Sequence, residues 1–277
     1  MRPHRGRAGG DQEGNFVRMG NVIAVGNLKG GTGKSTIAVN LACALAADGR
    51  DAVLVDADGQ GTATDWHAGH RLPLAVKSWP LGGERDAQRW VARVLALKAG
   101  LDDVVIDLPP QVGSGIASAL LIADLFVIPV TPSGVDLRAT GKALELLRRA
   151  RAVRGVDQPA CLLVPSRVDR RTAIGRRIQG TLERFGLRVG PAIRQQAAHI
   201  EAFDAGAWVG DHAPNTPAHR EINQLKDRVL DLLREIHPDD AHERALSVVA
   251  TPVGETPPLR VPHPGALFRH GDRATGT

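Results

Sequence analysis

The chain has 277 residues, a formal net charge of +5 and a pI near 9.7, which allows one large domain or two small ones. Aromatic residues make up only 3% of it and tyrosine is absent, so small aliphatic side chains must fill the core, as in helix-covered parallel sheets. No apolar run is long enough for a transmembrane helix, and no signal-peptide region is evident. The positive charge permits contact with nucleic acid or an anionic membrane but establishes neither.

The two ends of the chain differ from its middle in composition. Residues 1–19 carry no hydrophobic period, which predicts a flexible basic leader, and Met19 offers an internal translation start. Residues 237–277 are rich in proline, histidine, glycine and charge, which predicts a mostly disordered tail. We therefore expect one folded domain over residues 20–236.

Within that domain, short apolar runs alternate with longer helical patterns. Buried parallel strands are predicted at NVIAVGN (21–27), DAVLVDAD (51–58), DDVVIDLPP (102–110), LFVIPVT (125–131) and ACLLVPS (160–166). Helices are predicted over residues 34–49, 86–100, 133–153, 172–186 and 217–237. This alternation is typical of an α/β fold with a doubly wound, mostly parallel sheet flanked by helices, in which ligands bind at the carboxyl ends of the strands.

The segment NLKGGTGKST, residues 27–36, lies between the first predicted strand and the first predicted helix, where a phosphate-binding loop belongs. Its glycines let the backbone turn tightly and bring N–H groups close to phosphate oxygens. Lys34 is expected to bridge the β- and γ-phosphates, and Ser35 to offer its hydroxyl to Mg²⁺. The loop departs from G-x-x-x-x-G-K-[ST], because Leu28 occupies the first glycine position.

Lys29 is a second lysine in this loop, and one nucleotide already has Lys34 and the backbone amides. The sequence KGGTGKST resembles the deviant phosphate loop K-G-G-x-G-K-[ST] of the ParA/MinD family of ATPases. The resemblance implies a P-loop NTPase fold with ATP and Mg²⁺ as cofactors. It also implies that Lys29 reaches across a dimer interface to the partner's ATP; the alternative is a second cation for its own nucleotide. The expected nucleotide-binding residues of the loop are Lys29, Gly30, Gly31, Thr32, Gly33, Lys34, Ser35 and Thr36.

Two acidic motifs extend the resemblance. VLVDADGQGTATDW, residues 53–66, resembles the family motif D-x-D-P-Q-G, with Asp56 and Asp58 on its two acids. The resemblance implies that Asp58 is the acid that orients or activates the attacking water. Gly59 stands where the family usually has proline, and a solvated acidic turn is the alternative interpretation. VVIDLPP, residues 104–110, resembles the Walker B motif and places the Asp107 carboxylate near Mg²⁺. Ser35, Asp107 and Asp58 are therefore the expected metal-site residues, and Asp58, Lys29 and Lys34 the expected catalytic residues.

Later segments also match the family. ADLFVIPVTPSGVDLRAT, residues 123–140, resembles a strand followed by P-S-x-x-D-L-x-A-T, a form common in small ParA proteins. LLVPSRVDRRTAIGR resembles the strand and loop that flank the adenine, which places Pro165 and Arg167 beside the nucleotide. GPAIRQQAAHIEAFDAGAWV resembles the family's late loop and helix near the base. The resemblance covers about residues 20–235.

A group of arginines follows the adenine segment, and the family's DNA-contacting positions lie in this region. Guanidinium groups facing one way would bind DNA phosphates with a strong salt dependence, whereas the plainer interpretation is a solvated basic face. At Gln196 many small relatives have arginine, so one contact differs here. The candidate DNA-binding residues are Arg170, Arg171, Arg176, Arg177 and Arg194.

Other branches of the superfamily fit the sequence less well. Cys43 and Cys161 lie within a predicted helix and a predicted strand, which favours reduced core thiols over cluster ligands. The segment 217–236 carries its apolar residues on one face and precedes a long polar tail, which favours a core helix over a membrane-binding helix. A tyrosine kinase of this superfamily would need a tyrosine-rich tail.

The sequence therefore predicts a cytoplasmic, nucleoid-associated partition ATPase that dimerises on ATP, binds DNA without sequence preference and segregates a plasmid or chromosome, or positions another large cargo. A ParB-like or other cargo-bound adaptor is expected to stimulate its weak ATPase, and no membrane partner is expected. The alternatives are a MinD-like membrane-associated spatial regulator and a metabolic P-loop enzyme.

Overall fold

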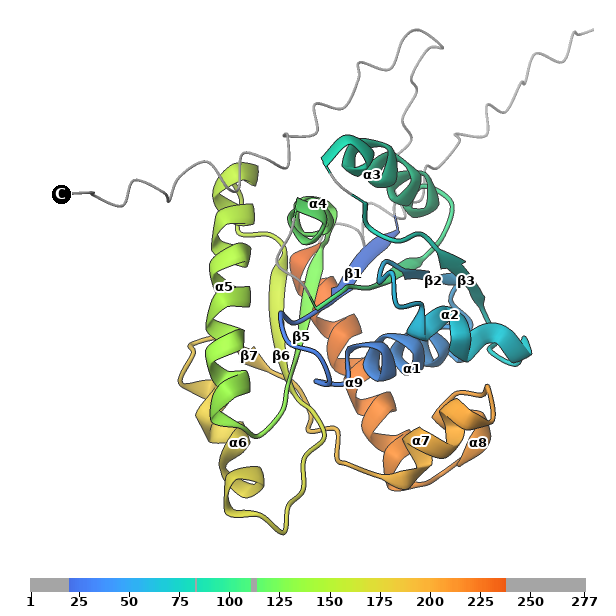
Figure 1. Ribbon diagram of the computed structural model, residues 1–277, viewed down its shortest axis with the longest axis vertical. Helices are drawn as coiled ribbons and strands as arrows, with labels where there is room; N and C mark the ends of the chain where they lie inside the picture. Colours follow the sequence, from blue (N-terminus) through green and yellow to red (C-terminus); the bar gives the residue numbers. More distant parts are fainter. Residues whose placement is uncertain (1–19, 83, 111–113, 238–277) are drawn as a thin grey trace, which may run out of the picture.

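The computed structural model describes residues 20–82, 84–110 and 114–237 (Figure 1). The predicted leader and residues 238–277 of the predicted tail lie outside these ranges, so the predicted domain boundaries stay predictions. The strands are β1 Asn21–Val25, β2 Ala52–Asp56, β3 Ala75–Ser78, β4 Asp103–Asp107, β5 Leu125–Val130, β6 Ala160–Pro165 and β7 Arg188–Val189.

The described strands form one sheet in the order β3-β2-β4-β1-β5-β6-β7, and every neighbouring pair is parallel. The first strand, β1, lies in the centre of the sheet. The strands β2 and β3 lie towards one edge, β4 lies between β2 and β1, and β5, β6 and β7 follow in order on the other side of β1. This is the doubly wound arrangement expected from the sequence, and the five predicted strands are confirmed. The edge strands β3 and β7 were not predicted.

Helices cover both faces of the sheet (Figure 1). They are α1 Lys34–Ala47, α2 Thr62–Trp66, the short 3-10 turn η1 His67–Gly69, α3 Glu84–Lys98, α4 Ser114–Ile122, α5 Gly134–Arg154, α6 Ala173–Glu183, α7 Ala197–Asp204, α8 Val209–His212 and α9 Pro217–Ile236. On one face lie α3 to α6, and on the other α1, α2 and α7 to α9. None of the helices in the described ranges combines the length and the apolar composition that a membrane-spanning helix needs.

Alternation along the central strands sends side chains to two separate cores. In β1, Val22 and Ala24 face the core beneath α3 to α6, whereas Ile23 and Val25 face the core beneath α1 and α9. The apolar face of α9 is buried in this second core, so the prediction of a core helix is confirmed. Cys43 and Cys161 are buried free thiols, one in each core.

Strand register brings the predicted motifs together. Val25, the last residue of β1, pairs with Asp107 at the end of β4, and Asp107 in turn pairs with Asp56 at the end of β2. The phosphate loop that follows β1 therefore lies beside both acidic strand ends. The functional groups meet at the carboxyl edge of the sheet, as the order of strands predicts.

Candidate functional site

The phosphate loop passes from β1 into α1 through two left-handed residues, Gly31 with φ 75° and Gly33 with φ 86°. Side chains rarely adopt such angles, and a Cβ at Gly33 would lie only 2.7 Å from the Ser166 hydroxyl oxygen. The helix begins at Lys34 with no side-chain cap on its first turn. Its N-terminal amides and the positive end of its dipole are therefore available to an anion.

Lys34 is directed into the site. Its side chain is buried, and its Nζ donates a 3.1 Å hydrogen bond to the backbone carbonyl of Lys29. Burial lowers the pKa of the Lys34 ammonium, although Asp107 and Asp58 favour its charged form. A cation held between a glycine loop and two acids fits the role of a direct phosphate ligand.

Asp56 and Asp58 of the second motif have different surroundings. The carboxylate of Asp56 is buried and accepts hydrogen bonds from the backbone N–H groups of Asp58 and Thr64, at 3.2 and 2.8 Å, and from the Thr64 hydroxyl. It thus ties the start of α2 to β2. Asp58 is half-buried, lines the pocket and accepts a hydrogen bond from the backbone of Gln60. Asp58 is therefore the acid of this motif that is free to meet a ligand.

Asp107 is fully buried, and neither of its carboxylate oxygens has a hydrogen-bond partner among the described residues. Burial raises the pKa of the Asp107 carboxyl to about 7, an effect that the nearby Ser35 hydroxyl and the Lys34 ammonium offset only in part. Unpartnered buried carboxylate oxygens are costly unless a cation uses them. With Ser35 on the adjoining helix, this arrangement fits Mg²⁺, which takes few protein ligands together with phosphate oxygens.

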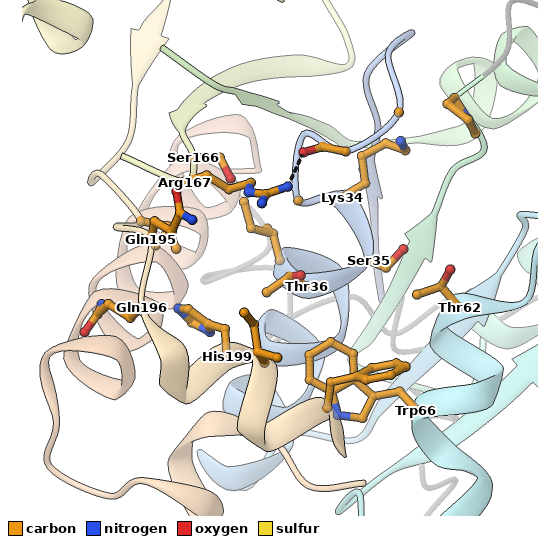
Figure 2. Close-up of a pocket in the computed structure, with 18 of the residues that line it drawn as sticks. Lys34, Ser35, Thr36, Thr62, Trp66, Ser166, Arg167, Gln195, Gln196 and His199 are labelled. Atoms are coloured by element: carbon orange, nitrogen blue, oxygen red, sulfur yellow. Dashed lines mark hydrogen bonds between the residues drawn. The ribbon is translucent and has the colours of Figure 1, made fainter. Parts of the chain in front are cut away.

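A pocket of about 500 Å³ opens beside the loop, and Figure 2 shows its labelled side chains. Arg167 reaches over the loop and donates a 3.0 Å hydrogen bond to the carbonyl of Gly31. Its backbone is itself left-handed, with φ 51°. Pro165 is the last residue of β6, and Ser166 and Arg167 are the residues of that segment that line the pocket.

The wall opposite the phosphate loop comes from the segment before and within α7. Gln195, Gln196 and His199 line it, with Ile200 and Phe203. His199 is only 8% exposed, and both of its ring nitrogens lack a hydrogen-bond partner among the described residues. Burial lowers the pKa of its imidazole, which favours the neutral ring. We did not predict His199 as a site residue; the only signal was its place in a segment that resembles the family's late loop and helix.

Lys29 differs from Lys34 in direction. Its side chain is 40% exposed, and its ammonium forms an ion pair with Asp136 in the first turn of α5. The residues that line the pocket include Lys34 and the loop glycines Gly30, Gly31 and Gly33 but not Lys29. The two lysines of one loop therefore face different surroundings.

The candidate DNA-binding arginines gather around α6 and the loop before it. Arg170, Arg171, Arg176 and Arg177 are exposed, although Arg171 pairs with Asp169. Arg194 differs, because its guanidinium forms an ion pair with the buried Glu221 of α9. The structure thus brings four of the five onto one exposed segment and engages the fifth internally.

Comparison with known proteins gives the family of the chain. Residues 23–209 match the model described as "CobQ/CobB/MinD/ParA nucleotide binding domain". The maintenance of carboxysome distribution protein A of Halothiobacillus neapolitanus is 33% identical over 217 residues, which are 75% of this chain and 95% of the relative. The chromosome-partitioning ATPase Soj of Thermus thermophilus is 28% identical, over 77% of this chain and 96% of the relative.

A solved structure has the same fold. The ATP complex of a McdA variant from Cyanothece superposes with a TM-score of 0.61 at 16% identity, covering 79% of this chain and 97% of that chain. At the level of the family, the expectation of an ATPase that uses ATP and Mg²⁺ is confirmed. With its doubly wound sheet, two-lysine phosphate loop and acidic strand ends, this chain belongs to the ParA/MinD family of nucleotide-binding ATPases.

Proposed function

We propose that this chain is a ParA-type positioning ATPase: it dimerises on ATP, binds DNA without sequence preference and segregates a plasmid or chromosome, or positions another large cargo. The observation that carries this proposal is the separation of the two loop lysines. Lys34 lines the pocket, whereas Lys29, whose side chain is partly exposed, is not among the residues that line it. A cation of the loop that does not serve its own pocket is available to an anion that another subunit brings.

Each residue of the site then has a role that its surroundings support. The amides of the glycine loop and the Lys34 ammonium bind the phosphates, and Ser35 and Asp107 hold Mg²⁺. When bound, Mg²⁺ supplies positive charge that neutralises the β- and γ-phosphate oxygens. Asp58 orients the attacking water, because it is the half-buried acid in the pocket. Lys29 meets the phosphates of the partner subunit's nucleotide.

Non-specific DNA binding is supported by the exposed arginines at α6. Arg170, Arg176 and Arg177 have no acidic partner among the ion pairs of the described residues, although the Arg176 guanidinium donates to the backbone carbonyl of Arg171 at 2.7 Å. No carboxylate neutralises their charges, so these charges can attract phosphate. Two such surfaces side by side in a dimer would bind more tightly than one, with counterion release as the driving force. Such binding would hold the active form on the nucleoid in the cytoplasm.

For the cargo, we propose only its class: DNA or a large protein assembly. Two relatives are named for carboxysome distribution and for chromosome partition, so both a DNA cargo and a large protein assembly fit. A ParB-like or other adaptor on the cargo would stimulate hydrolysis and so release the ATPase from DNA. A membrane partner fits less well, because the apolar face of α9 is packed in the core.

Co-sedimentation tests this proposal. The protein is mixed with plasmid DNA or with anionic liposomes, each with ATP, with ADP or without nucleotide. We expect ATP-dependent binding to DNA of any sequence, falling steeply as salt rises, and no binding to liposomes. ATP-dependent binding to liposomes alone would support a MinD-like regulator instead. ATP turnover that requires a small-molecule substrate would support a metabolic enzyme.

A further inference from the structure

The ion pair between Lys29 and Asp136 joins the phosphate loop to α5, two segments that are far apart in the chain. Lys29 follows β1, and Asp136 lies in the first turn of α5, just after β5. Because β1 and β5 are neighbours in the sheet, their carboxyl ends bring these residues together. The contact therefore depends on the fold and is not local in sequence.

Asp136 is held firmly from its own side. Its carboxylate is 1% exposed, and its second oxygen accepts a hydrogen bond from the Thr131 hydroxyl. Its backbone N–H donates to the Ser133 hydroxyl oxygen at 3.1 Å, which caps α5, and its carbonyl accepts from Thr140 at 2.8 Å. The carboxylate thus has a fixed position, set by a helix terminus.

The first carboxylate oxygen of Asp136 has no hydrogen-bond partner apart from this ion pair among the described residues. Lys29 is accordingly the cation that compensates this buried charge. If the lysine left to reach another anion, the carboxylate would stay buried without a cation, which is strongly unfavourable. We therefore expect Lys29 to stay in contact with Asp136 when a second anion binds.

An ammonium group can serve two anions at once. It carries three N–H donors, and the Lys29 side chain remains 40% exposed while it contacts Asp136. The contact with Asp136 also restricts the rotamers of the Lys29 side chain before the subunits associate. The entropy cost of ordering this side chain therefore no longer opposes association. Both effects favour a lysine that is fixed before the partner subunit docks.

We infer that Asp136 is a positioning residue for Lys29: it fixes the ammonium at the protein surface, where the remaining donors meet the phosphates of a nucleotide held by a second copy of the chain. This inference rests on the proposed function, because it requires that second copy. It adds the residue that makes the cross-subunit lysine effective. Asp136 itself touches neither nucleotide nor water in this scheme.

The first test concerns the contact alone, in the nucleotide-free monomer. Lysines are acylated with a limiting amount of acetic anhydride, and the label on each is measured by mass spectrometry. Asp136→Asn is nearly isosteric and keeps an acceptor for Thr131 but loses the charge. We expect Lys29 to be labelled several-fold faster in this variant, with the exposed Lys77 and Lys142 unchanged as internal references. Equal labelling of Lys29 in both proteins would overturn the inference, because Asp136 would not hold it.

The second test concerns assembly, measured as ATP-dependent dimerisation by analytical ultracentrifugation in an Asp58→Ala background that slows hydrolysis. Asp136→Asn should weaken dimerisation by on the order of tenfold, while monomer affinity for a fluorescent ATP analogue stays the same. With Lys29 already replaced by alanine, Asp136→Asn should weaken dimerisation no further, because its effect acts through the lysine. Glu145→Gln makes the same carboxylate-to-amide change further along α5, where Glu145 pairs only with Arg148 and Arg149 among the described residues. It leaves the pair of Lys29 and Asp136 intact, so it should dimerise as its Asp58→Ala parent does.

The outcomes separate the two levels of the proposal. If the Asp58→Ala parent does not dimerise with ATP, the proposed function fails, whatever the labelling shows. If the parent dimerises and Asp136→Asn dimerises equally well, Asp136 has no positioning role. If Asp136→Asn dimerises more readily, the carboxylate restrains Lys29, which also contradicts the inference. Equal weakening with and without Lys29 would show a purely structural effect.

Discussion

Asp56 and Asp107 occupy paired positions at the ends of adjacent strands, and their surroundings give them opposite roles. Asp56 accepts hydrogen bonds from three donors, so its charge is satisfied within the fold. Asp107 is equally buried, but its oxygens have no hydrogen-bond partner among the described residues. Both oxygens can therefore accept contacts from a bound cation. At the scale of single residues, hydrogen-bond partners distinguish the carboxylate that holds the fold together from the one that we propose binds Mg²⁺.

Replacing each of these acids by asparagine should have contrasting effects. Asp107→Asn should weaken Mg²⁺-dependent binding of a fluorescent ATP analogue about tenfold or more, with stability unchanged or raised, because an unpaired buried charge is removed. Asp56→Asn should lower the free energy of unfolding by about 1–3 kcal/mol, because an amide cannot accept all three hydrogen bonds. Urea unfolding and a Mg²⁺ titration measure both effects. The reverse pattern would mean that the two roles are exchanged.

His199 should make the stability of the nucleotide-free protein depend on pH. Burial lowers its pKa below the ordinary 6.5, so the unfolded chain binds the proton more readily than the folded protein. The contribution of the neutral His199 ring to the free energy of unfolding is therefore fully present above about pH 6.5, and it is lost as the pH falls below that value. Unfolding free energies at about pH 7.5 and about pH 5.5 should differ less for His199→Gln than for the parent. Burial also lowers the pKa values of His67 and His219, but these two residues are present in both proteins and so do not affect the comparison. An unchanged difference would show that His199 does not titrate this way.

The parts of the candidate site that local motifs mark could be predicted from the sequence, and the parts made by tertiary contact could not. Residues 29–36 and the acids Asp58 and Asp107 are marked by local motifs, and register at the sheet edge brings them together. The ion pair of Lys29 with Asp136 and the unpartnered ring of His199 arise from packing between separate elements, which no local pattern records.

At the scale of elements, pattern strength decided which ones were predicted. The five central strands are continuous apolar runs because they are buried on both faces, and they were found. The edge strand β3 is largely exposed and β7 has two residues, so neither carries such a run. The short helices α2 and α8 span less than two turns, and α4 is apolar along its length, so a helical period does not stand out.

The helix α9 offers a test of its core assignment. Leu225 is fully buried in the core beneath α1, whereas the adjacent Gln224 is exposed. Leu225→Ala should lower the free energy of unfolding by about 2–5 kcal/mol, because it removes buried methyl groups and leaves a cavity. Gln224→Ala, the matched control on the same helix, should change it by less than about 0.5 kcal/mol. Urea unfolding measures both. Similar small effects would show that α9 is not part of the core.

The helix α6 offers a test of the proposed DNA surface. Reversing the charge of Arg176 and Arg177 together should weaken ATP-dependent DNA binding and reduce its salt dependence, because fewer counterions are released. Basal ATP turnover should not change, since neither residue lines the pocket. Arg89→Glu on α3, another exposed arginine, is the control and should leave DNA binding near the parent value. Fluorescence anisotropy across a salt series measures this. Equal loss for the control would indicate only a general effect of net charge.

At the scale of the whole molecule, the candidate nucleotide site lies at the carboxyl edge of the sheet, and the proposed dimer forms through the outward surface of this edge. The pocket, the acids and Lys34 form the candidate nucleotide site within one chain. Lys29 lies outside that pocket, so the proposed cycle needs a second chain to complete each site. Closing two anionic nucleotides face to face brings like charges together, and one lysine from each subunit would offset that repulsion in a site with little water.

The most direct test of this account is the mass of the protein with ATP, measured by analytical ultracentrifugation for Asp58→Ala and for Lys29→Ala. Asp58→Ala should bind ATP and accumulate as a dimer, because only the positioning of water is lost. Lys29→Ala should bind ATP through Gly30 to Ser35 and remain a monomer. Dimerisation of Lys29→Ala with ATP as complete as that of Asp58→Ala would contradict the account, and Lys29 would then be a second cation for its own nucleotide.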